Sequence, residues 1–235
     1  MKVIILAGGL GTRISEETSN KPKPMVLINN KPILWHIMSI FAKQGYRNFL
    51  IATGFKSEVI EKWVRGVNDS WDIEILNTGL DTQTGGRILE CMKYLSGERV
   101  FVTYGDGLGN VDLRALVDFH THQGKLATIT AVRPPARFGV LRSKNGLVTE
   151  FGEKLQADAG WINGGFFILE PEVKNFISNS SEPFETDALP KLVKAKQLAS
   201  YHHDGFWYPM DTMREKQELE IISRMDIPSW LSGIN

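Results

Sequence analysis

The sequence has almost no cysteine and no excess of charge of either sign. Cys91 is the single cysteine among 235 residues, so an internal disulfide framework is excluded, and its apolar helical neighbours suggest a packing role. Lysine plus arginine and aspartate plus glutamate each number 27, which gives a formal net charge of zero. The basic surplus typical of nucleic-acid-binding proteins is therefore missing, and we predict no nucleic-acid partner. A small anionic ligand needs only a few local cations.

Long hydrophobic runs are also missing. The apolar run that follows Lys2 ends at Ala7, which is too short for the core of a signal peptide. No stretch approaches the roughly 18 apolar residues of a membrane span. We therefore expect a cytoplasmic protein with no membrane partner. Hydrophobic residues make up 42% of the chain, which is sufficient for a well-formed core.

Strand and helix patterns alternate through residue 132. Short apolar runs predict strands at 3–6, 48–53, 71–76, 100–104 and 126–132, and periodic patterns predict helices at 32–41, 56–65, 86–95 and 111–122. This alternation predicts an α/β fold with a mainly parallel sheet covered by helices on both faces. Residues 8–24, which are rich in glycine, polar residues and proline, are expected to form a loop.

The pattern changes near residue 138. Short strands are expected at 138–141, 146–151 and 161–169, and helices at 172–177, 185–195 and 211–224. No linker or repeat divides the chain. We therefore predict a single domain over residues 1–235, in which residues 133–235 complete the first half, 1–132, and close over its binding edge.

The strongest chemical signal is a glycine-rich loop after the first strand, with the sequence LAGGLGTR at 6–13 followed by KPKPM at 21–25. Glycines in this position let backbone N–H groups approach a phosphate, and Arg13 and Lys23 add cations suited to a triphosphate. Ile14 stands where a dinucleotide fingerprint needs a third small residue, and no Gly-Lys-Ser/Thr follows, so neither that fingerprint nor a P-loop is matched. The alternative is a plain glycine turn with incidental cations.

Two aspartates stand out. Asp106 follows the strand at 100–104, at the edge where ligands bind in open α/β sheets, and could hold Mg²⁺; the alternative is a turn residue between two glycines. Asp211 precedes a helical pattern, and the local sequence alone favours a role as the N-cap of that helix.

Other polar segments give weaker signals. Residues 78–87 offer small polar groups, backbone amides and Arg87 before a helix, which suits a nucleobase or phosphate; the alternative is a turn with a capping segment. Glu153-Lys154 and Asn163-Gly164-Gly165 are compatible with solvated surface and a sharp bend. His202 and His203 point to opposite faces if they lie on a strand, so we predict that they are structural.

With these residues assembled, the chain resembles the sugar nucleotidyltransferases, and among them the cytidylyltransferase branch that uses glucose 1-phosphate. The resemblance runs from Met1 to about Trp230. Its general part is the LAGGLGTR and KPKPM pair. Its more specific part consists of SEET at 15–18, KPILWHIM at 31–38, TGGR at 84–87, TYGDG at 103–107, WINGGFF at 161–167, DGFW at 204–207 and PMDT at 209–212.

The resemblance implies a Rossmann-like three-layer nucleotidyltransferase fold and a Mg²⁺-dependent reaction of CTP with a sugar-1-phosphate, giving a CDP-sugar for surface polysaccharide. Residues 1–132 would bind the nucleotide and 133–235 the sugar phosphate. Asp106 and Asp211 would share Mg²⁺, so the resemblance favours metal binding by Asp211 over the capping role that its local sequence suggests. The implied catalytic residues are Arg13, Lys23, Asp106, Lys154 and Asp211. The implied nucleotide-binding residues are Leu6, Ala7, Gly8, Gly9, Gly11, Thr12, Arg13, Lys23, Thr82, Arg87 and Gly105, and the sugar-phosphate residues are Glu153, Lys154 and Asn163.

Three departures distinguish the chain from the glucose enzyme it resembles. The region between Val64 and Ile73, which contributes to subunit contacts in such enzymes, is much shorter here, so the oligomeric state stays open, a homo-oligomer included. Leu155 replaces the proline of Glu-Lys-Pro, and Tyr208 replaces a glutamine. Both lie near the expected sugar, so the identity of the sugar stays open.

Three alternatives follow from these residues. One is the same reaction with another phosphate acceptor or another nucleotide. The second is a non-catalytic nucleotide-sensing regulatory protein, which has no need of all five implied catalytic residues together. The third is a nicotinamide-dependent oxidoreductase, which the broken dinucleotide fingerprint disfavours.

Overall fold

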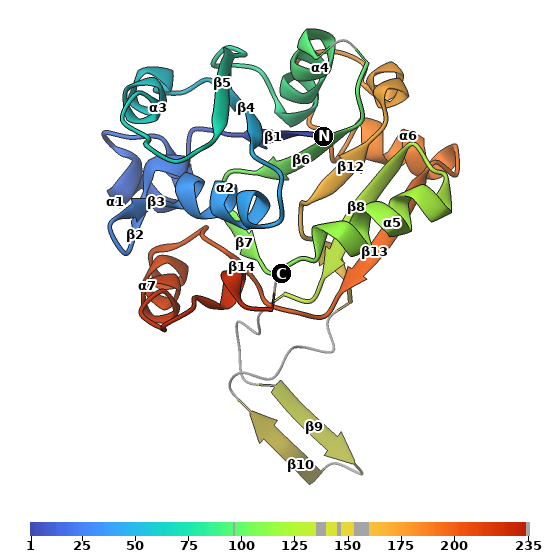
Figure 1. Cartoon of the computed structure of the whole chain (residues 1–235). Helices are drawn as coiled ribbons and strands as arrows, with labels where there is room; N and C mark the ends of the chain where they lie inside the picture. Colours follow the sequence, from blue (N-terminus) through green and yellow to red (C-terminus); the bar gives the residue numbers. More distant parts are fainter. Residues whose placement is uncertain (96, 135–139, 145–146, 153–159, 234–235) are drawn as a thin grey trace.

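A mixed, mostly parallel sheet lies at the centre of the protein (Figure 1), which we describe from a computed structural model. The structure describes all residues except 96, 135–139, 145–146, 153–159 and 234–235. Within the described residues the sheet has eight strands: β1 (Lys2–Leu6), β4 (Asn48–Thr53), β5 (Asp72–Asn77), β6 (Val100–Tyr104), β8 (Ala127–Val132), β11 (Ile162–Asn163), β12 (Phe167–Leu169) and β13 (Leu198–His203).

The strand order brings the two halves of the chain into one sheet. The order is β11-β8-β12-β6-β1-β4-β5, and β13 also pairs with β8. The pairs of β1 with β4 and β6, of β4 with β5, and of β13 with β8 are parallel. The later strands β11 and β12 run antiparallel to their neighbours. Because β1 and β6 are adjacent and parallel, the glycine loop and Asp106 emerge at the same edge of the sheet.

Helices cover both faces of this sheet, as the sequence predicts. Along β1, Val3 and Ile5 belong to one buried cluster and Ile4 and Leu6 to another, because successive side chains of a strand point to opposite faces. The first cluster includes residues of α2 (Ile33–Lys43), α3 (Ser57–Val64) and α5 (Leu113–Gln123). The second includes residues of α4 (Thr84–Tyr94) and α6 (Ala188–Lys194). The predicted three-layer α/β fold is therefore confirmed.

The strand predicted at 161–169 is interrupted. Gly165 has φ 76° and Phe166 has φ 44°, so the backbone turns in the left-handed region between β11 and β12. A side chain at Gly164 would also meet Val132 Cγ1 at 2.5 Å. The bend that the two glycines suggest is therefore real, and one predicted strand becomes two short ones.

Several short elements were not predicted. The expected loop at 8–24 contains η1 (Thr12–Ile14), α1 (Ser15–Thr18) and the start of η2 (Lys23–Met25). These turns have local support, since the Thr18 hydroxyl donates to the carbonyl oxygens of Gly11 at 3.0 Å and Ile14 at 3.1 Å. The other elements that were not predicted are β2 (Leu27–Ile28), β3 (Lys31–Pro32), β7 (Gly107–Gly109), β14 (Trp207–Pro209) and η4 (Ser229–Leu231). The remaining elements outside the central sheet overlap predicted ones: β9 (Val140–Lys144), β10 (Leu147–Gly152), η3 (Pro171–Phe176) and α7 (Met213–Ile222).

Two further expectations can be compared with the structure. Cys91 is fully buried in the second cluster, which confirms its packing role, and burial raises the pKa of its thiol to about 12. In the part of the chain that is described, no helix is both long enough and apolar enough to cross a membrane.

Candidate active site

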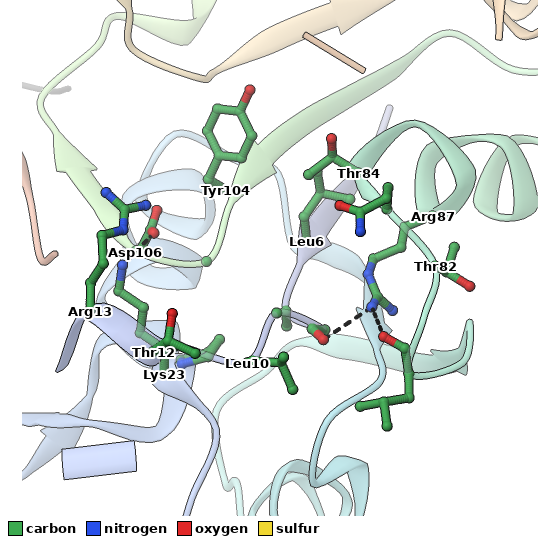
Figure 2. A pocket seen from close by; sticks show the side chains of 18 of the residues that line it. Leu6, Leu10, Thr12, Arg13, Lys23, Thr82, Thr84, Arg87, Tyr104 and Asp106 are labelled. Atoms are coloured by element: carbon green, nitrogen blue, oxygen red, sulfur yellow. Dashed lines mark hydrogen bonds and ion pairs between the residues drawn. The ribbon is translucent and has the colours of Figure 1, made fainter. Parts of the chain in front are cut away.

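A cleft of about 520 Å³ lies at the carboxyl ends of β1 and β6 (Figure 2). One wall is the glycine loop, and the facing wall is formed by residues 80–87 at the start of α4. All of the predicted nucleotide-binding residues line this cleft: Leu6, Ala7, Gly8, Gly9, Gly11, Thr12, Arg13, Lys23, Thr82, Arg87 and Gly105. Asp106 lines it too.

The glycine loop needs a glycine at position 11. Gly11 has φ 67°, and a side chain there would meet Thr18 Cγ2 at 2.9 Å and Lys23 Cβ at 3.1 Å. Gly11 is also the residue that precedes η1, whose first residues are Thr12 and Arg13. The tight turn therefore brings Arg13 and Lys23 to the same side of the cleft, where both line it.

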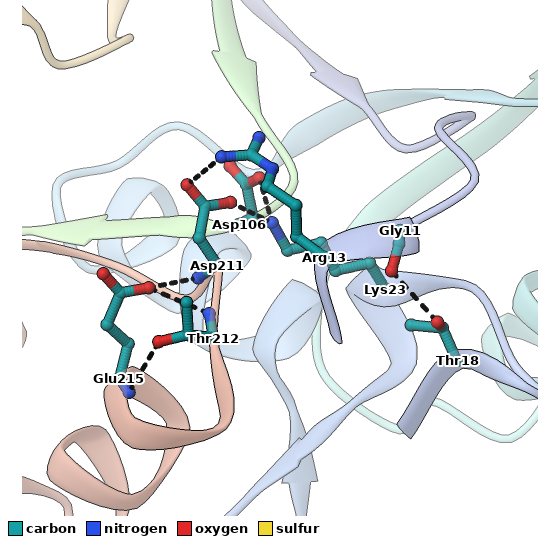
Figure 3. Close-up of polar contacts among 8 residues, drawn as sticks. All are labelled: Gly11, Arg13, Thr18, Lys23, Asp106, Asp211, Thr212 and Glu215. Carbon is teal, nitrogen blue, oxygen red and sulfur yellow. Dashed lines mark hydrogen bonds and ion pairs between the residues drawn. The ribbon is translucent and has the colours of Figure 1, made fainter. Parts of the chain in front are cut away.

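Four charged residues converge beside the cleft, as Figure 3 shows. Lys23 Nζ lies 2.7 Å from Asp106 Oδ2 and 2.5 Å from Asp211 Oδ1. Arg13 Nη1 lies 2.6 Å from Asp211 Oδ2. The structure thus joins four predicted catalytic residues that are up to 198 positions apart in the sequence.

Lys23 is held in its charged form by this arrangement. It is 8% exposed, and burial alone lowers the pKa of an ammonium group. The charges and hydrogen bonds of Asp106 and Asp211 outweigh that burial, so the pKa of Lys23 is raised above its ordinary value. A buried ammonium whose charge is stabilised by its neighbours therefore stands between the two carboxylates.

Asp211 is not the N-cap of the helix that follows it, so the capping role predicted from the local sequence is wrong. Thr212 is the N-cap of α7: its hydroxyl accepts from the backbone N–H of Glu215 at 3.3 Å (Figure 3). The Glu215 carboxylate accepts in return from the backbone N–H groups of Asp211 at 2.7 Å and Thr212 at 2.9 Å. This reciprocal capping box leaves the Asp211 side chain directed to Lys23 and Arg13. The threonine followed three residues later by glutamate is the signal that identifies this cap.

Arg87 lines the cleft, but its guanidinium is directed to backbone carbonyl groups. The side chain is 4% exposed, and its nitrogens donate to the carbonyl oxygens of Thr53 at 2.8 Å, Gly79 at 2.9 Å and Gly8 at 3.0 Å. Dashed lines in Figure 2 mark hydrogen bonds of this group. The three carbonyls belong to the glycine loop, the end of β4 and the loop after β5. Arg87 therefore ties the two walls of the cleft together.

Two glycines make room for this guanidinium. A side chain at Gly8 would lie 2.2 Å from Arg87 Cζ, and one at Gly54 would lie 2.7 Å from Arg87 Nη1. Real Cβ atoms do not approach other atoms so closely. Because a peptide unit is planar, holding the Gly8 carbonyl also fixes the direction of the Gly9 N–H at the floor of the cleft.

A second polar group was not predicted from the sequence. The Tyr104 hydroxyl donates to Glu185, and the Thr84 hydroxyl donates to the other oxygen of the same carboxylate at 2.7 Å. All three residues line the cleft. Asn163, the predicted sugar contact, donates from Nδ2 to the Tyr104 hydroxyl at 2.8 Å. Of these residues, Asn163 was predicted as a sugar contact from the resemblance and Tyr104 was noticed only as part of the TYGDG motif, whereas no local pattern points to Glu185.

The remaining predicted residues are placed less directly. Glu153 and Lys154 lie outside the described residues, as does Leu155. The Tyr208 hydroxyl donates to Glu218 on α7, so it is directed away from the lining of the cleft. His203 is half-buried and close to the Phe206 carbonyl, at 3.2 Å from Nε2.

This arrangement suits a polyanionic ligand. Backbone amides of a glycine loop and two cations face the cleft beside two carboxylates. The described part of the chain contains no group of three or more histidine, cysteine, aspartate or glutamate side chains that could hold a metal ion. A pair of carboxylates is nevertheless what Mg²⁺ commonly uses when it also binds phosphate oxygens.

Comparison with known proteins gives a consistent result. The profile of the family described as "Nucleotidyl transferase" matches residues 2–214. The chain is 42% identical to the glucose-1-phosphate cytidylyltransferase of Salmonella typhimurium, across 94% of this chain and 95% of that protein. It is 33% identical to the D-glycero-α-D-manno-heptose 1-phosphate guanylyltransferase of Aneurinibacillus thermoaerophilus, across 94% of this chain and 99% of that protein.

A solved structure shows the same arrangement of the chain. The crystal structure of HddC from Yersinia pseudotuberculosis complexed with GMP-PN superimposes with a TM-score of 0.72 and 26% sequence identity. The match covers 94% of this chain and 98% of that one.

Proposed function

This chain belongs to the nucleotidyl transferase family, and on that premise we propose that it forms a CDP-sugar and pyrophosphate from CTP and a sugar-1-phosphate, with glucose 1-phosphate as the acceptor. The identity of 42% to a glucose-1-phosphate cytidylyltransferase, over nearly the full length of both chains, supports the choice of substrates. The convergence of Arg13, Lys23, Asp106 and Asp211 beside the glycine loop is the observation that carries the proposal.

The reaction needs no covalent intermediate. An oxygen of the sugar phosphate attacks the α-phosphorus of CTP in line, and the new P–O bond forms as the bond from the α-phosphorus to the bridging oxygen breaks. Pyrophosphate leaves with that electron pair. The attacking phosphate is already an anion, so a strong general base is not required. The barrier comes from repulsion between two anions and from charge that grows at the α-phosphate.

The cations of the cleft stabilise this negative charge. Arg13 can form two hydrogen bonds to phosphate oxygens, and Lys23 supplies a point charge. The backbone N–H groups of the loop from Gly8 to Thr12 bind the phosphates without side-chain obstruction. Thr82, Arg87 and Gly105 border the nucleotide, Arg87 by holding the two walls in place.

Asp106 and Asp211 would hold Mg²⁺. Their fit rests on the structure, because one oxygen of each carboxylate lies within 2.7 Å of the same Lys23 nitrogen and the pair thus converges on one point of positive charge. When bound, Mg²⁺ neutralises charge on the phosphates and on the departing pyrophosphate. Lys23, which lies beside both carboxylates, would contact the nucleotide phosphates.

The acceptor side draws on residues from 133–235, and we propose that both halves of 1–235 act as one catalytic domain. Lys154 would hold and orient the attacking phosphate, and Glu153 and Asn163 would contact the sugar. This assignment follows the match of Glu153-Lys154 and of the WINGG segment to the family pattern.

The test is pyrophosphate release in the presence of Mg²⁺, with CTP, UTP, dTTP, ATP and GTP each paired with a panel of sugar-1-phosphates. We expect release with CTP and glucose 1-phosphate. GTP with mannose or heptose 1-phosphate is an informative comparison, because a guanylyltransferase of heptose 1-phosphate is 33% identical to this chain. Pyrophosphate release with CTP and another acceptor would change the assigned sugar substrate and leave the proposed mechanism unchanged. Tight nucleotide binding with no release for any pair would contradict the proposal.

A further inference from the structure

Tyr104 is a junction between three parts of the cleft. It is the last residue of β6, two positions before Asp106. Its hydroxyl accepts a hydrogen bond from Asn163 on β11 at 2.8 Å and donates one to Glu185, which lies in the segment before α6. One hydroxyl therefore connects the strand that leads to Asp106 with residues 59 and 81 positions away in the sequence.

The donor and the acceptor can be assigned for each hydrogen bond in the series that links Gly165, Asn163, Tyr104 and Glu185. The backbone N–H of Gly165 can only donate, so the atom of the Asn163 amide that faces it at 2.9 Å is the oxygen. The amide nitrogen of Asn163 then faces Tyr104 and donates to it. The tyrosine proton is left for Glu185, whose ionised carboxylate only accepts.

Glu185 is held from a second side. Its other oxygen accepts from the Thr84 hydroxyl at 2.7 Å, and that hydroxyl accepts from the backbone N–H of Phe184 at 2.9 Å. Two directed chains of hydrogen bonds thus end on the same carboxylate. Such chains hold their members in one arrangement as long as each donor meets an acceptor.

The tyrosine ring is also fixed. A side chain at Gly165 would lie 3.2 Å from Tyr104 Cδ2, so the absence of one lets the turn after Asn163 approach the ring. The ring of Phe167 packs edge-on against it, with centroids 5.8 Å apart.

The hydrogen-bonding capacity left over matches a sugar. The Asn163 amide has a second N–H, and the Glu185 carboxylate has further lone pairs beside the cleft that it lines. A sugar hydroxyl both donates and accepts, so a fixed donor and a fixed acceptor at one site recognise it by orientation.

We propose that Tyr104 is a positioning residue for the sugar acceptor, whose hydroxyl holds the Asn163 amide and the Glu185 carboxylate in the arrangement that the acceptor meets. The inference rests on the proposed function for the identity of the acceptor. It concerns the acceptor and not the nucleotide, because the groups that Tyr104 orients are distinct from the glycine loop and from Arg13 and Lys23.

The experiment compares wild type with Tyr104→Phe, which removes only the hydroxyl. Steady-state kinetics give KM for glucose 1-phosphate and for CTP, and calorimetry gives the Kd of CTP. We expect KM for the sugar phosphate to rise about tenfold, the usual consequence of losing a hydrogen bond to a charged group, while the Kd of CTP changes less than twofold. Tyr94→Phe is the matched control, because the Tyr94 hydroxyl also donates to a glutamate, Glu74, at 2.7 Å on an exposed surface. This control should leave all three constants unchanged.

A second measurement needs no turnover. In protein labelled with ¹⁵N at asparagine, the side-chain amide signal of Asn163, assigned with Asn163→Asp, should shift in Tyr104→Phe and stay in place in Tyr94→Phe. An unmoved signal would overturn the inference, and so would equal losses in the affinity for CTP and for the acceptor. If wild type turns over no nucleotide and acceptor pair, the proposed function fails, and the amide signal still decides whether Tyr104 positions Asn163.

Discussion

Replacing Lys23 with methionine should strengthen the binding of a divalent cation in the absence of nucleotide. The Lys23 ammonium lies 2.7 Å from Asp106 Oδ2 and 2.5 Å from Asp211 Oδ1, so a cation that binds these carboxylates must displace it. Methionine has a similar length and no charge. The variant therefore removes a competitor and leaves both carboxylates in place.

The size of the effect follows from what the ammonium gives up. A hydrogen bond between charged groups contributes about 1.5–3 kcal/mol net. The Asp106 side chain is 32% exposed, so solvent screens its pair with Lys23 and the lower end of this range is appropriate. Release from even one of the two contacts, about 1.5 kcal/mol, corresponds to a gain in cation affinity of about tenfold, which is therefore the smallest gain expected.

The assay is a titration with Mn²⁺ followed by the electron paramagnetic resonance signal of the free ion, without nucleotide. Lys191→Met is the matched control, since it removes the same charge from a pair with a single carboxylate, Asp187. The gain should disappear in the double variant Lys23→Met with Asp106→Asn. Mn²⁺ binding by Lys23→Met that equals or falls below wild type would refute the reasoning, because the ammonium would then not compete for the carboxylates.

Three further predictions follow from the structure. Asp106→Asn should lower turnover about 100-fold or more at an unchanged melting temperature, and near-normal kcat would contradict its proposed role in holding Mg²⁺. Arg87→Met should lower the free energy of unfolding by about 3 kcal/mol, because several buried carbonyls lose their donor, and should weaken CTP binding. Added guanidinium at low millimolar concentration should restore part of that binding, whereas urea of the same shape should not; equal effects of both would show that the charge of Arg87 is unimportant. Burial lowers the pKa of His36, His120 and His203, so the unfolded chain takes up protons first as the pH falls. The free energy of unfolding, measured with urea, should therefore be constant above the ordinary histidine pKa of about 6.5 and decrease below it; constant stability down to pH 5 would contradict this.

Local patterns were sufficient for much of the fold and for one wall of the cleft. The strands at 48–53 and 100–104 lie where their apolar runs predict, since such runs are buried on both faces of the sheet. The glycine loop was recognised because its glycines follow a strand directly. Asp106 was recognised because the carboxyl edge of a parallel sheet is where ligands bind.

Contacts between residues that are far apart in the sequence could not be predicted from local patterns. Glu185 sits in a polar segment whose sequence gives no sign that it meets Tyr104, and only the folded chain brings the two together. The sequence alone identifies Arg87 only as a cation before a helix, whereas the carbonyl groups that it contacts lie up to 79 positions away. The misassigned cap is different, because Thr212 and Glu215 carry a local capping signature that an exclusive focus on Asp211 overlooks.

The fit of Gly8 and Gly54 around the Arg87 side chain restricts the order in which this chain can change its sequence. A side chain at position 8 overlaps the guanidinium, so it requires that Arg87 shifts or becomes smaller, whereas a side chain at position 54 also meets the backbone oxygen of Gly79 at 2.6 Å. The reverse order, in which Arg87 is acquired last, requires that both glycines are already present. Positions 8 and 87 should therefore vary together among descendants of this sequence, whereas position 54 should stay glycine even in a lineage that has lost the arginine, because the Gly79 backbone also fills that space.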